Sequence, residues 1–108
     1  MIKMIAFVKR KAGLSREEFI QRWVHEHTAL SLKLGMVGYR INIALEPQPD
    51  ENEPLFDGTA ELWWPDEATM QAALASPANV IAAQDTERFC ETLQFVYTEE
   101  FIVRDTEQ

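Results

Sequence analysis

The sequence is poor in cysteine, glycine and basic residues, and it has no long apolar run. Cys90 is the one cysteine among 108 residues, so an internal disulfide is excluded and a reducing compartment is favoured. A lone cysteine of this kind is more often a small buried hydrophobic residue than a reactive thiol. The sequence contains no glycine-rich phosphate loop, no G-x-S-x-G elbow and no Cys–His motif. Several familiar kinds of site are therefore excluded.

The charge balance excludes two classes of partner. Eighteen acidic residues against ten basic ones give a formal net charge of −8. Such a surface is unsuited to the phosphates of nucleic acids and to anionic lipid. The remaining partners are a small molecule, another protein or a second copy of the same chain.

The apolar residues are numerous but scattered. They make up 46% of the sequence, which is enough for the core of one domain spanning residues 1–108. The longest runs, such as Met4 to Val8, are far too short to cross a bilayer. No small-residue cleavage site follows a hydrophobic stretch at the N-terminus, so we expect no signal peptide and a cytoplasmic location.

The clearest element is a helix that starts after Ser15 and ends at Gly35. Ser15 and Glu18 form a capping box, and Leu14 and Phe19 are placed as a hydrophobic staple. Gly35 stands where a C-terminal cap is expected. An apolar stripe at three- and four-residue spacing predicts the buried face, and it consists of Ile20, Trp23, Val24, His27, Leu30 and Leu34.

The rest of the chain predicts strands and two further helices. Strands are expected at Ile2–Val8, Tyr39–Leu45, Thr59–Trp64 and Leu93–Val103, with an acidic, proline-rich loop at Glu46–Pro54. One helix should begin at Pro65-Asp66-Glu67 and end near Ala75, and another should run from Ser76-Pro77 to about Phe89. The order β-α-β-β-α-β predicts an α+β, ferredoxin-like fold, in which helices cover one face of a four-stranded antiparallel sheet.

The uncovered face of this sheet predicts a homodimer. A sheet with one wet face should alternate cleanly between apolar and polar residues. Here the first strand is apolar in both phases, because Ile5 and Phe7 alternate with Met4, Ala6 and Val8. The third strand has Trp63 between Leu62 and Trp64. A second copy of the sheet would bury these residues, although a monomer with an apolar patch is the alternative.

His27 is the polar member of the apolar helical stripe, so its imidazole should point at the sheet. Histidine exchanges protons near neutral pH and can act as a general acid or base. On spacing alone, a hydrogen-bonded core histidine is the better interpretation. His25 lies roughly 200° around the helix and should face solvent, so the two cannot hold one metal, and we expect no metal site.

Other candidate residues lie on the predicted strands. Glu61 is a carboxylate in mid-strand, and burial would raise its pKa unless a cation or donor compensates; an edge position facing water is equally compatible. Arg40 and Asn42 share one face of a strand and can hold a carbonyl or an anion, or lie at an interface. The tryptophans Trp23, Trp63 and Trp64 suit the wall of a pocket that accepts an aromatic molecule, but tryptophans of this kind are more often core residues.

Several of these residues together resemble the EthD family of dimeric α+β barrel proteins. The resemblance covers nearly the whole chain, and the helical histidine in its aromatic context is its most specific part. The matching stretches are Phe19-x3-Trp23-x3-His27 with Thr28-Ala29-Leu30, Gly38-Tyr39-Arg40 with Asn42, Phe56-Asp57-Gly58 with Glu61-Leu62-Trp63, Asp85 to Phe89, and Glu99-Glu100.

The resemblance implies a homodimer with a pocket between helices and sheet, and it favours a functional His27. Similar barrels include isomerases, polyketide cyclases and cofactor-free monooxygenases, so the fold does not fix the reaction. Our leading hypothesis is an enzyme that moves a proton on a small cyclic or aromatic substrate without a cofactor. His27 would be the acid/base and Glu61 its partner or a second acid, with substrate contacts from Trp23, Tyr39, Arg40, Asn42 and Trp63.

Two alternatives stay open at this point. One is a non-catalytic ligand-binding or accessory protein for a redox system, since EthD-like proteins are associated with ether degradation beside a cytochrome P450 system. The other is haem binding with His27 as the axial ligand.

Overall fold

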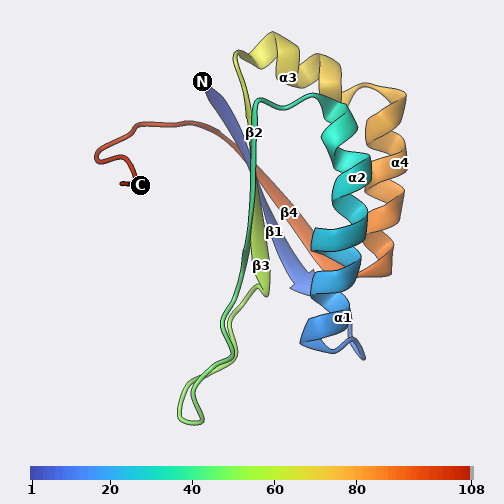
Figure 1. Ribbon diagram of the computed structural model, residues 1–108, viewed down its shortest axis with the longest axis vertical. Coiled ribbons are helices and arrows are strands. Elements are labelled where there is room, and N and C mark those ends of the chain that lie inside the picture. The colour runs from blue at the N-terminus through green and yellow to red at the C-terminus, as the bar shows by residue number, and fades with distance from the viewer. Residues whose placement is uncertain (108) are drawn as a thin grey trace.

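The computed structural model describes residues 1–107, which form a four-stranded antiparallel sheet with its helices on one face (Figure 1). The strands are β1 (Ile2–Arg10), β2 (Gly38–Ile43), β3 (Gly58–Trp64) and β4 (Cys90–Glu99). Their order across the sheet is β2-β3-β1-β4, with every neighbouring pair antiparallel. The predicted ferredoxin-like α+β fold is confirmed.

The first crossover is one continuous helical segment with an internal change of pitch. It comprises α1 (Arg16–Ile20), a π-helix (Gln21–His27), α2 (Thr28–Ser31) and a 3₁₀ turn (Leu32–Leu34). Ser15 and Glu18 make both bonds of the predicted capping box. Gly35 ends the segment with a φ of 70°, the left-handed conformation that favours glycine. The predicted start and end of this helix are confirmed.

The second crossover contains two helices, as predicted. They are α3 (Glu67–Leu74), capped by the side chain of Asp66, and α4 (Pro77–Asp85), followed by a 3₁₀ turn (Thr86–Arg88). Ser76 is the N-cap residue of α4, but its hydroxyl donates to the carbonyl of Ala73 instead of capping the helix. Figure 1 shows α2 and α4 side by side over the sheet.

The last strand was predicted to start three residues too late and to end four residues too late. It starts at Cys90 and ends at Glu99, because Glu99 pairs with Ile2, where the neighbouring β1 begins. The apolar triplet Phe101-Ile102-Val103 therefore has no strand to pair with, and its side chains are exposed. Figure 1 shows this C-terminal segment leaving the sheet on the side away from the helices.

The second strand is also shorter than predicted. It ends at Ile43, which pairs with Gly58, and Leu45 is exposed in the loop that follows. The predicted loop between β2 and β3 is confirmed, and it extends away from the body of the molecule (Figure 1).

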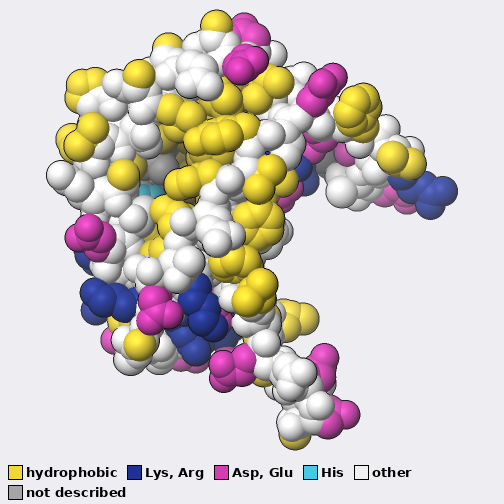
Figure 2. Space-filling model, turned by 180° about the vertical axis from the view of Figure 1, so that it is seen from behind, with side chains coloured by type: hydrophobic (Ala, Val, Ile, Leu, Met, Phe, Trp, Pro, Cys, Tyr) yellow, Lys and Arg dark blue, Asp and Glu magenta, His cyan; other side chains and the backbone are white. Residues whose placement is uncertain are grey.

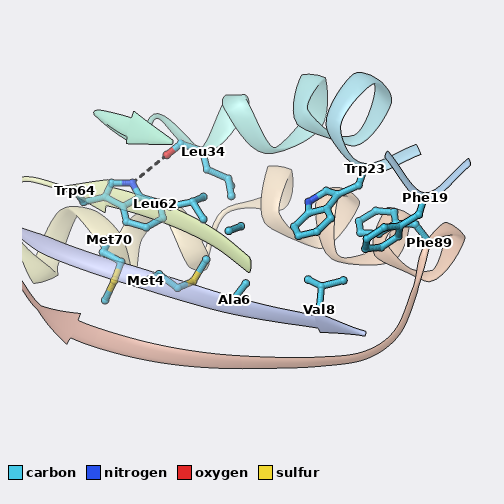
Figure 3. Close-up of a cluster of buried hydrophobic side chains, with 11 residues drawn as sticks. Met4, Ala6, Val8, Phe19, Trp23, Leu34, Leu62, Trp64, Met70 and Phe89 are labelled. Atoms are coloured by element: carbon cyan, nitrogen blue, oxygen red, sulfur yellow. Dashed lines mark hydrogen bonds between the residues drawn. The ribbon is translucent and has the colours of Figure 1, made fainter. Parts of the chain in front are cut away.

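The core lies between the helices and the face of the sheet that they cover, here called the inner face. Two groups of large side chains fill its ends (Figure 3). Trp64, Leu62, Met70 and Leu34 form one group, and the indole of Trp64 donates to the carbonyl of Leu34. Phe19, Trp23 and Phe89 form the other. Small side chains, among them Ala6 and Ala60, lie in the sheet between the two groups.

Candidate active site

The space that the alanines leave open is a cavity of about 460 Å³ between the helices and the inner face. This volume is in the range of small-molecule sites. Figure 2 shows a mostly apolar hollow on this side of the molecule, with histidine visible beside it. Most of its polar lining comes from the helical segments of the two crossovers, whereas more than half of its apolar lining residues come from the sheet. The polar residues are His27, Ser31, Tyr39, Gln71, Asn79, Thr86 and Tyr97.

His27 lines this cavity and is held by Asp85 at the end of α4. The distance from His27 Nδ1 to Asp85 Oδ2 is 2.9 Å, and both side chains are largely buried. An ionised carboxylate can only accept, so Nδ1 carries the proton and donates it to Asp85. The other ring nitrogen, Nε2, has no hydrogen-bond partner within residues 1–107. Nε2 is thus the nitrogen available to a molecule in the cavity.

Asp85 is in turn fixed by Arg88. Arg88 Nη1 donates to Asp85 Oδ1 at 3.2 Å, and Nη2 donates to Glu26. Burial pushes the pKa of Asp85 upward, but the hydrogen bonds from His27 and Arg88 outweigh it and leave this pKa below its ordinary value. Asp85 therefore stays a carboxylate at neutral pH and keeps His27 in one tautomer and orientation.

The π-helix explains which residues reach the cavity. A π turn takes more residues than an α turn, so positions four apart stay on one face. The buried side chains are accordingly Phe19, Trp23, His27, Ser31 and Leu34. This corrects the predicted stripe, in which Ile20, Val24 and Leu30 were expected to be buried and are only partly so. π turns inside helices occur frequently at functional sites.

Aromatic side chains hold the His27 ring from the other side. Phe89 meets the imidazole edge-on with ring centroids 5.0 Å apart, and Trp23 stacks on Phe89 at 5.7 Å. Gly58 gives the Trp23 ring its space, because a Cβ at this position would come within 2.5 Å of the indole. In the sequence Gly58 stood only within the matching stretch Phe56-Asp57-Gly58, and its role beside Trp23 was missed.

Tyr39 and Ser31 form a second polar group in the cavity, here called the hydroxyl pair. Tyr39 Oη lies 2.9 Å from Ser31 Oγ, and Ser31 is also 3.4 Å from the carbonyl oxygen of Thr28. Burial raises the pKa of the Tyr39 phenol, which is therefore neutral at physiological pH. Ser31 is buried, and it was missed in the sequence because its small polar side chain is not a member of the apolar stripe.

The other predicted site residues lie on the opposite, outer face of the sheet. Glu61 Oε1 contacts Lys3 Nζ at 2.6 Å, and Glu61 Oε2 accepts from Asn42 at 2.9 Å. Arg40 and Lys3 both lie over the ring of Trp63. The predicted partnership of Glu61 with His27 is wrong, because successive strand residues point to opposite faces and Leu62, not Glu61, faces the helices.

The site therefore gathers only part of the predicted set. The structure brings His27, Trp23 and Tyr39 together in the cavity, and it separates them from Glu61, Arg40, Asn42 and Trp63. The hydrogen bond from Lys3 lowers the pKa of Glu61 below its ordinary value, so a cation does compensate this carboxylate. Asp85 is the partner that sequence reasoning missed, although it stood at the edge of a matching stretch.

Two kinds of feature are not found in the part of the chain that the structure describes. No three His, Cys, Asp or Glu side chains gather in a way that could hold a metal ion. No helix among these residues is long and apolar enough to span a membrane.

Comparisons with known proteins agree with this architecture. The fold and the position of the cavity define an α+β protein of the ferredoxin-like class, with its pocket between helices and sheet. The EthD domain model matches residues 11–92, and the chain belongs to the EthD family. No curated protein matches the sequence significantly.

Three solved structures illustrate the similarity. An ethyl tert-butyl ether D family protein from Bacillus halodurans is 20% identical with a TM-score of 0.77, over 94% of this chain and 99% of that one. A hydroxynitrile lyase from Passiflora edulis is 18% identical with a TM-score of 0.68, over 99% and 96%. A dimeric protein of unknown function from Bacteroides fragilis is 16% identical with a TM-score of 0.65, over 92% and 95%.

Proposed function

We propose that this protein is an enzyme that moves a proton on a small cyclic or aromatic molecule, with His27 as the general acid/base and without a cofactor. The observation that carries the proposal is the His27–Asp85 pair. A carboxylate fixes one ring nitrogen at 2.9 Å and leaves the other free beside a cavity of about 460 Å³. This is the arrangement that a positioned acid/base requires.

The step itself needs only this pair and the substrate. Nε2 of neutral His27 takes a proton from a C–H next to a carbonyl group, or from a hydroxyl group. The imidazolium that forms is stabilised by the Asp85 carboxylate, and it later returns the proton to another atom of the substrate. An isomerase, a cyclase or a lyase can be built on such a transfer. That a neighbour of this fold is a hydroxynitrile lyase supports catalysis in general, but at 18% identity it transfers no residue role.

The experiment measures proton transfer directly. The purified protein is incubated in D₂O with neutral cyclic ketones such as 2-tetralone, and deuteration next to the carbonyl is followed by NMR. We expect His27→Gln to slow this exchange by roughly 10²- to 10⁴-fold, the usual contribution of a general acid/base. His25→Gln is the matched control, because His25 is exposed on the same helix and should leave the rate unchanged.

A melting curve of the same variant separates the two interpretations of His27. A purely structural histidine would lower the melting temperature and leave the exchange rate per folded molecule untouched. Full exchange activity in a well-folded His27→Gln protein would end the catalytic proposal. The accessory-protein alternative would then gain support if the cavity still bound the ketones. For haem binding, a missing Soret band after haem addition would remove that alternative.

We also infer that two copies pair through their outer faces. The outer face has large apolar side chains, among them Ile5, Phe7 and Trp63, and Val96 is 47% exposed. The unpaired Phe101-Ile102-Val103 segment extends on the same side (Figure 1). Two neighbours of this fold are described as dimeric, which supports the inference. Light scattering on a dilute sample should give the mass of two chains, and a stable mass of one chain would contradict it.

A further inference from the structure

The absence of charged side chains from the cavity lining that the structure describes restricts which ligands can bind there. Within residues 1–107, its lining contains no Lys, Arg, Asp or Glu side chain. The nearest formal charge that the contacts define is Asp85, which lies directly behind His27 and is held there by Arg88. An anionic ligand would lose its hydration without gaining a cationic partner, and it would approach a carboxylate. Burying a charge under these conditions is costly.

The hydroxyl pair offers a second anchor near His27. Ser31 follows His27 by four residues in the same helical segment, so the two side chains are neighbours on one face, roughly 5–6 Å apart at Cβ. Ser31 fixes the Tyr39 phenol at 2.9 Å, and Tyr39 lines the cavity. Ser31 has one hydroxyl proton, which can go to the Thr28 carbonyl at 3.4 Å or to the phenol. When it turns to the phenol, the phenol O–H can donate to an oxygen atom in the cavity.

The residues earlier expected to hold a substrate oxygen cannot do so here. Arg40 and Asn42 lie on the outer face, with Asn42 bonded to Thr59 and Glu61. The hydroxyl pair is on the correct side of the sheet, and it carries no charge. Together with the uncharged lining, it indicates one class of ligand.

We propose that the cavity selects neutral, largely apolar molecules that carry a carbonyl or hydroxyl oxygen, and that Tyr39, positioned by Ser31, donates a hydrogen bond to this oxygen. Molecules of the same shape that carry a carboxylate are rejected. The inference rests on the proposed function, since the bound oxygen lies one helical turn from the acid/base. Tyr39 stabilises negative charge on that oxygen while His27 holds the proton.

The test uses three probes of one shape, measured by isothermal titration calorimetry with the full chain at pH 7. They are 2-acetylnaphthalene, 2-naphthoate and 2-ethylnaphthalene. We expect the neutral ketone to bind, the naphthoate to bind at least about 10-fold more weakly, and the ethyl compound to lose about 5-fold, the contribution of one hydrogen bond. Equal or tighter binding of the naphthoate would overturn the proposal, as would failure of the ketone to bind.

Matched variants locate the hydrogen bond. Tyr39→Phe should bring the ketone down to the affinity of the ethyl compound and leave the ethyl compound unchanged. Ser31→Ala should reduce the ratio of the two affinities in part, which a loss of packing alone would not do. Ser76→Ala is the matched control and should leave the ratio unchanged, because Ser76 is outside the cavity lining and its hydroxyl donates to the carbonyl of Ala73. An unchanged ratio in Tyr39→Phe would overturn the assignment of Tyr39.

The selectivity of the cavity and the catalytic role of His27 can each fail without the other. Charge selection with normal exchange activity in His27→Gln would keep the selectivity and remove His27 as the acid/base. Loss of exchange in His27→Gln with equal binding of ketone and naphthoate would leave the enzyme and remove the selectivity.

Discussion

The polar groups on the two faces of the sheet have different surroundings, as the neighbouring residues Trp63 and Trp64 show. Trp64 points to the inner face, is fully buried and donates its indole N–H to a backbone carbonyl. Trp63 points to the outer face, where its indole donates to Glu100 and its ring lies under Lys3. The inner face is nearly free of charge, whereas the outer face carries an ion network between apolar side chains.

The contrast indicates separate tasks for the two faces. On the inner face the polar groups of His27 and the hydroxyl pair line the cavity, where a small molecule can contact them. On the outer face Lys3 is bound at 2.6 Å to both Glu61 and Glu100, and the charge of Arg40 also lowers the pKa of both carboxyl groups. The two cations and the two carboxylates therefore compensate one another within the chain. Charges paired in this way can tolerate cover by a second copy, because none is left without a partner.

The largest expected effect compares the two tryptophans. Trp64→Ala should lower the free energy of unfolding by about 3–5 kcal/mol, because it removes a fully buried ring from the core. Trp63→Ala should cost much less within one chain but should shift the mass toward the monomer. Urea unfolding and light scattering at matched protein concentrations measure the two quantities.

Two results would contradict the expected difference between Trp63 and Trp64. An equal loss of unfolding free energy in both variants at a concentration where each is monomeric would mean that the outer face is as much a part of the core as the inner one. Retention of the dimer in Trp63→Ala would place the contact between copies elsewhere.

The second prediction concerns the pair that distinguishes the inner face. Asp85→Asn should slow the ketone exchange by nearly as much as His27→Gln, roughly 10²-fold or more, because an amide can favour the wrong imidazole tautomer. Glu26→Gln is the control, since it removes only the outer partner of Arg88 and leaves Asp85 bound to His27. A wild-type exchange rate in Asp85→Asn would show that the tautomer is fixed by something else.

The sequence was a good guide to the fold because its signals were local. The capping box at Ser15, the stop at Gly35 and the period-two strands all act within a few residues, and the structure contains them. The end of β4 was missed because it is set by the beginning of its neighbour. Phe101 to Val103 is as apolar as any strand, yet no partner remains beside it.

The candidate site was predicted only in part, for two physical reasons. The π-helix keeps Trp23 and His27 on one face, and Ser31 is buried beside them although its polar side chain left it out of the predicted apolar stripe. The partner of His27 comes from α4, 58 residues away, and no spacing rule connects them. Glu61 was predicted as a site residue because it is a carboxylate in mid-strand. Leu62, however, is the residue of this pair that faces the helices.

The smallest expected effect tests the ion network of the outer face through pH. The hydrogen bond from Lys3 holds the pKa of Glu61 below its ordinary value, so Glu61 contributes stability above the pKa of an unfolded glutamate, about 4.3, and loses it as the pH falls through the folded pKa. Burial alone would lower the pKa of Lys3, but its bonds to Glu100 and Glu61 raise it above 10.5. The lysine contribution is therefore present below pH 10.5 and is lost only as the pH rises through the raised value.

The melting temperature of Glu61→Gln should consequently lie a few degrees below that of the wild type between pH 6 and 8, because an ion pair near the surface contributes about 1 kcal/mol or less to the free energy of unfolding. The two curves should converge once the pH has fallen through the lowered pKa values of both carboxyl groups of the network, because both are then protonated. Glu107→Gln in the exposed C-terminal segment is the control and should follow the wild type throughout. A difference that stays constant as the pH falls through the folded pKa of Glu61 would mean that Glu61 acts through packing and not through its charge. The contrast between a charged outer face and an uncharged inner face would then lose its electrostatic basis.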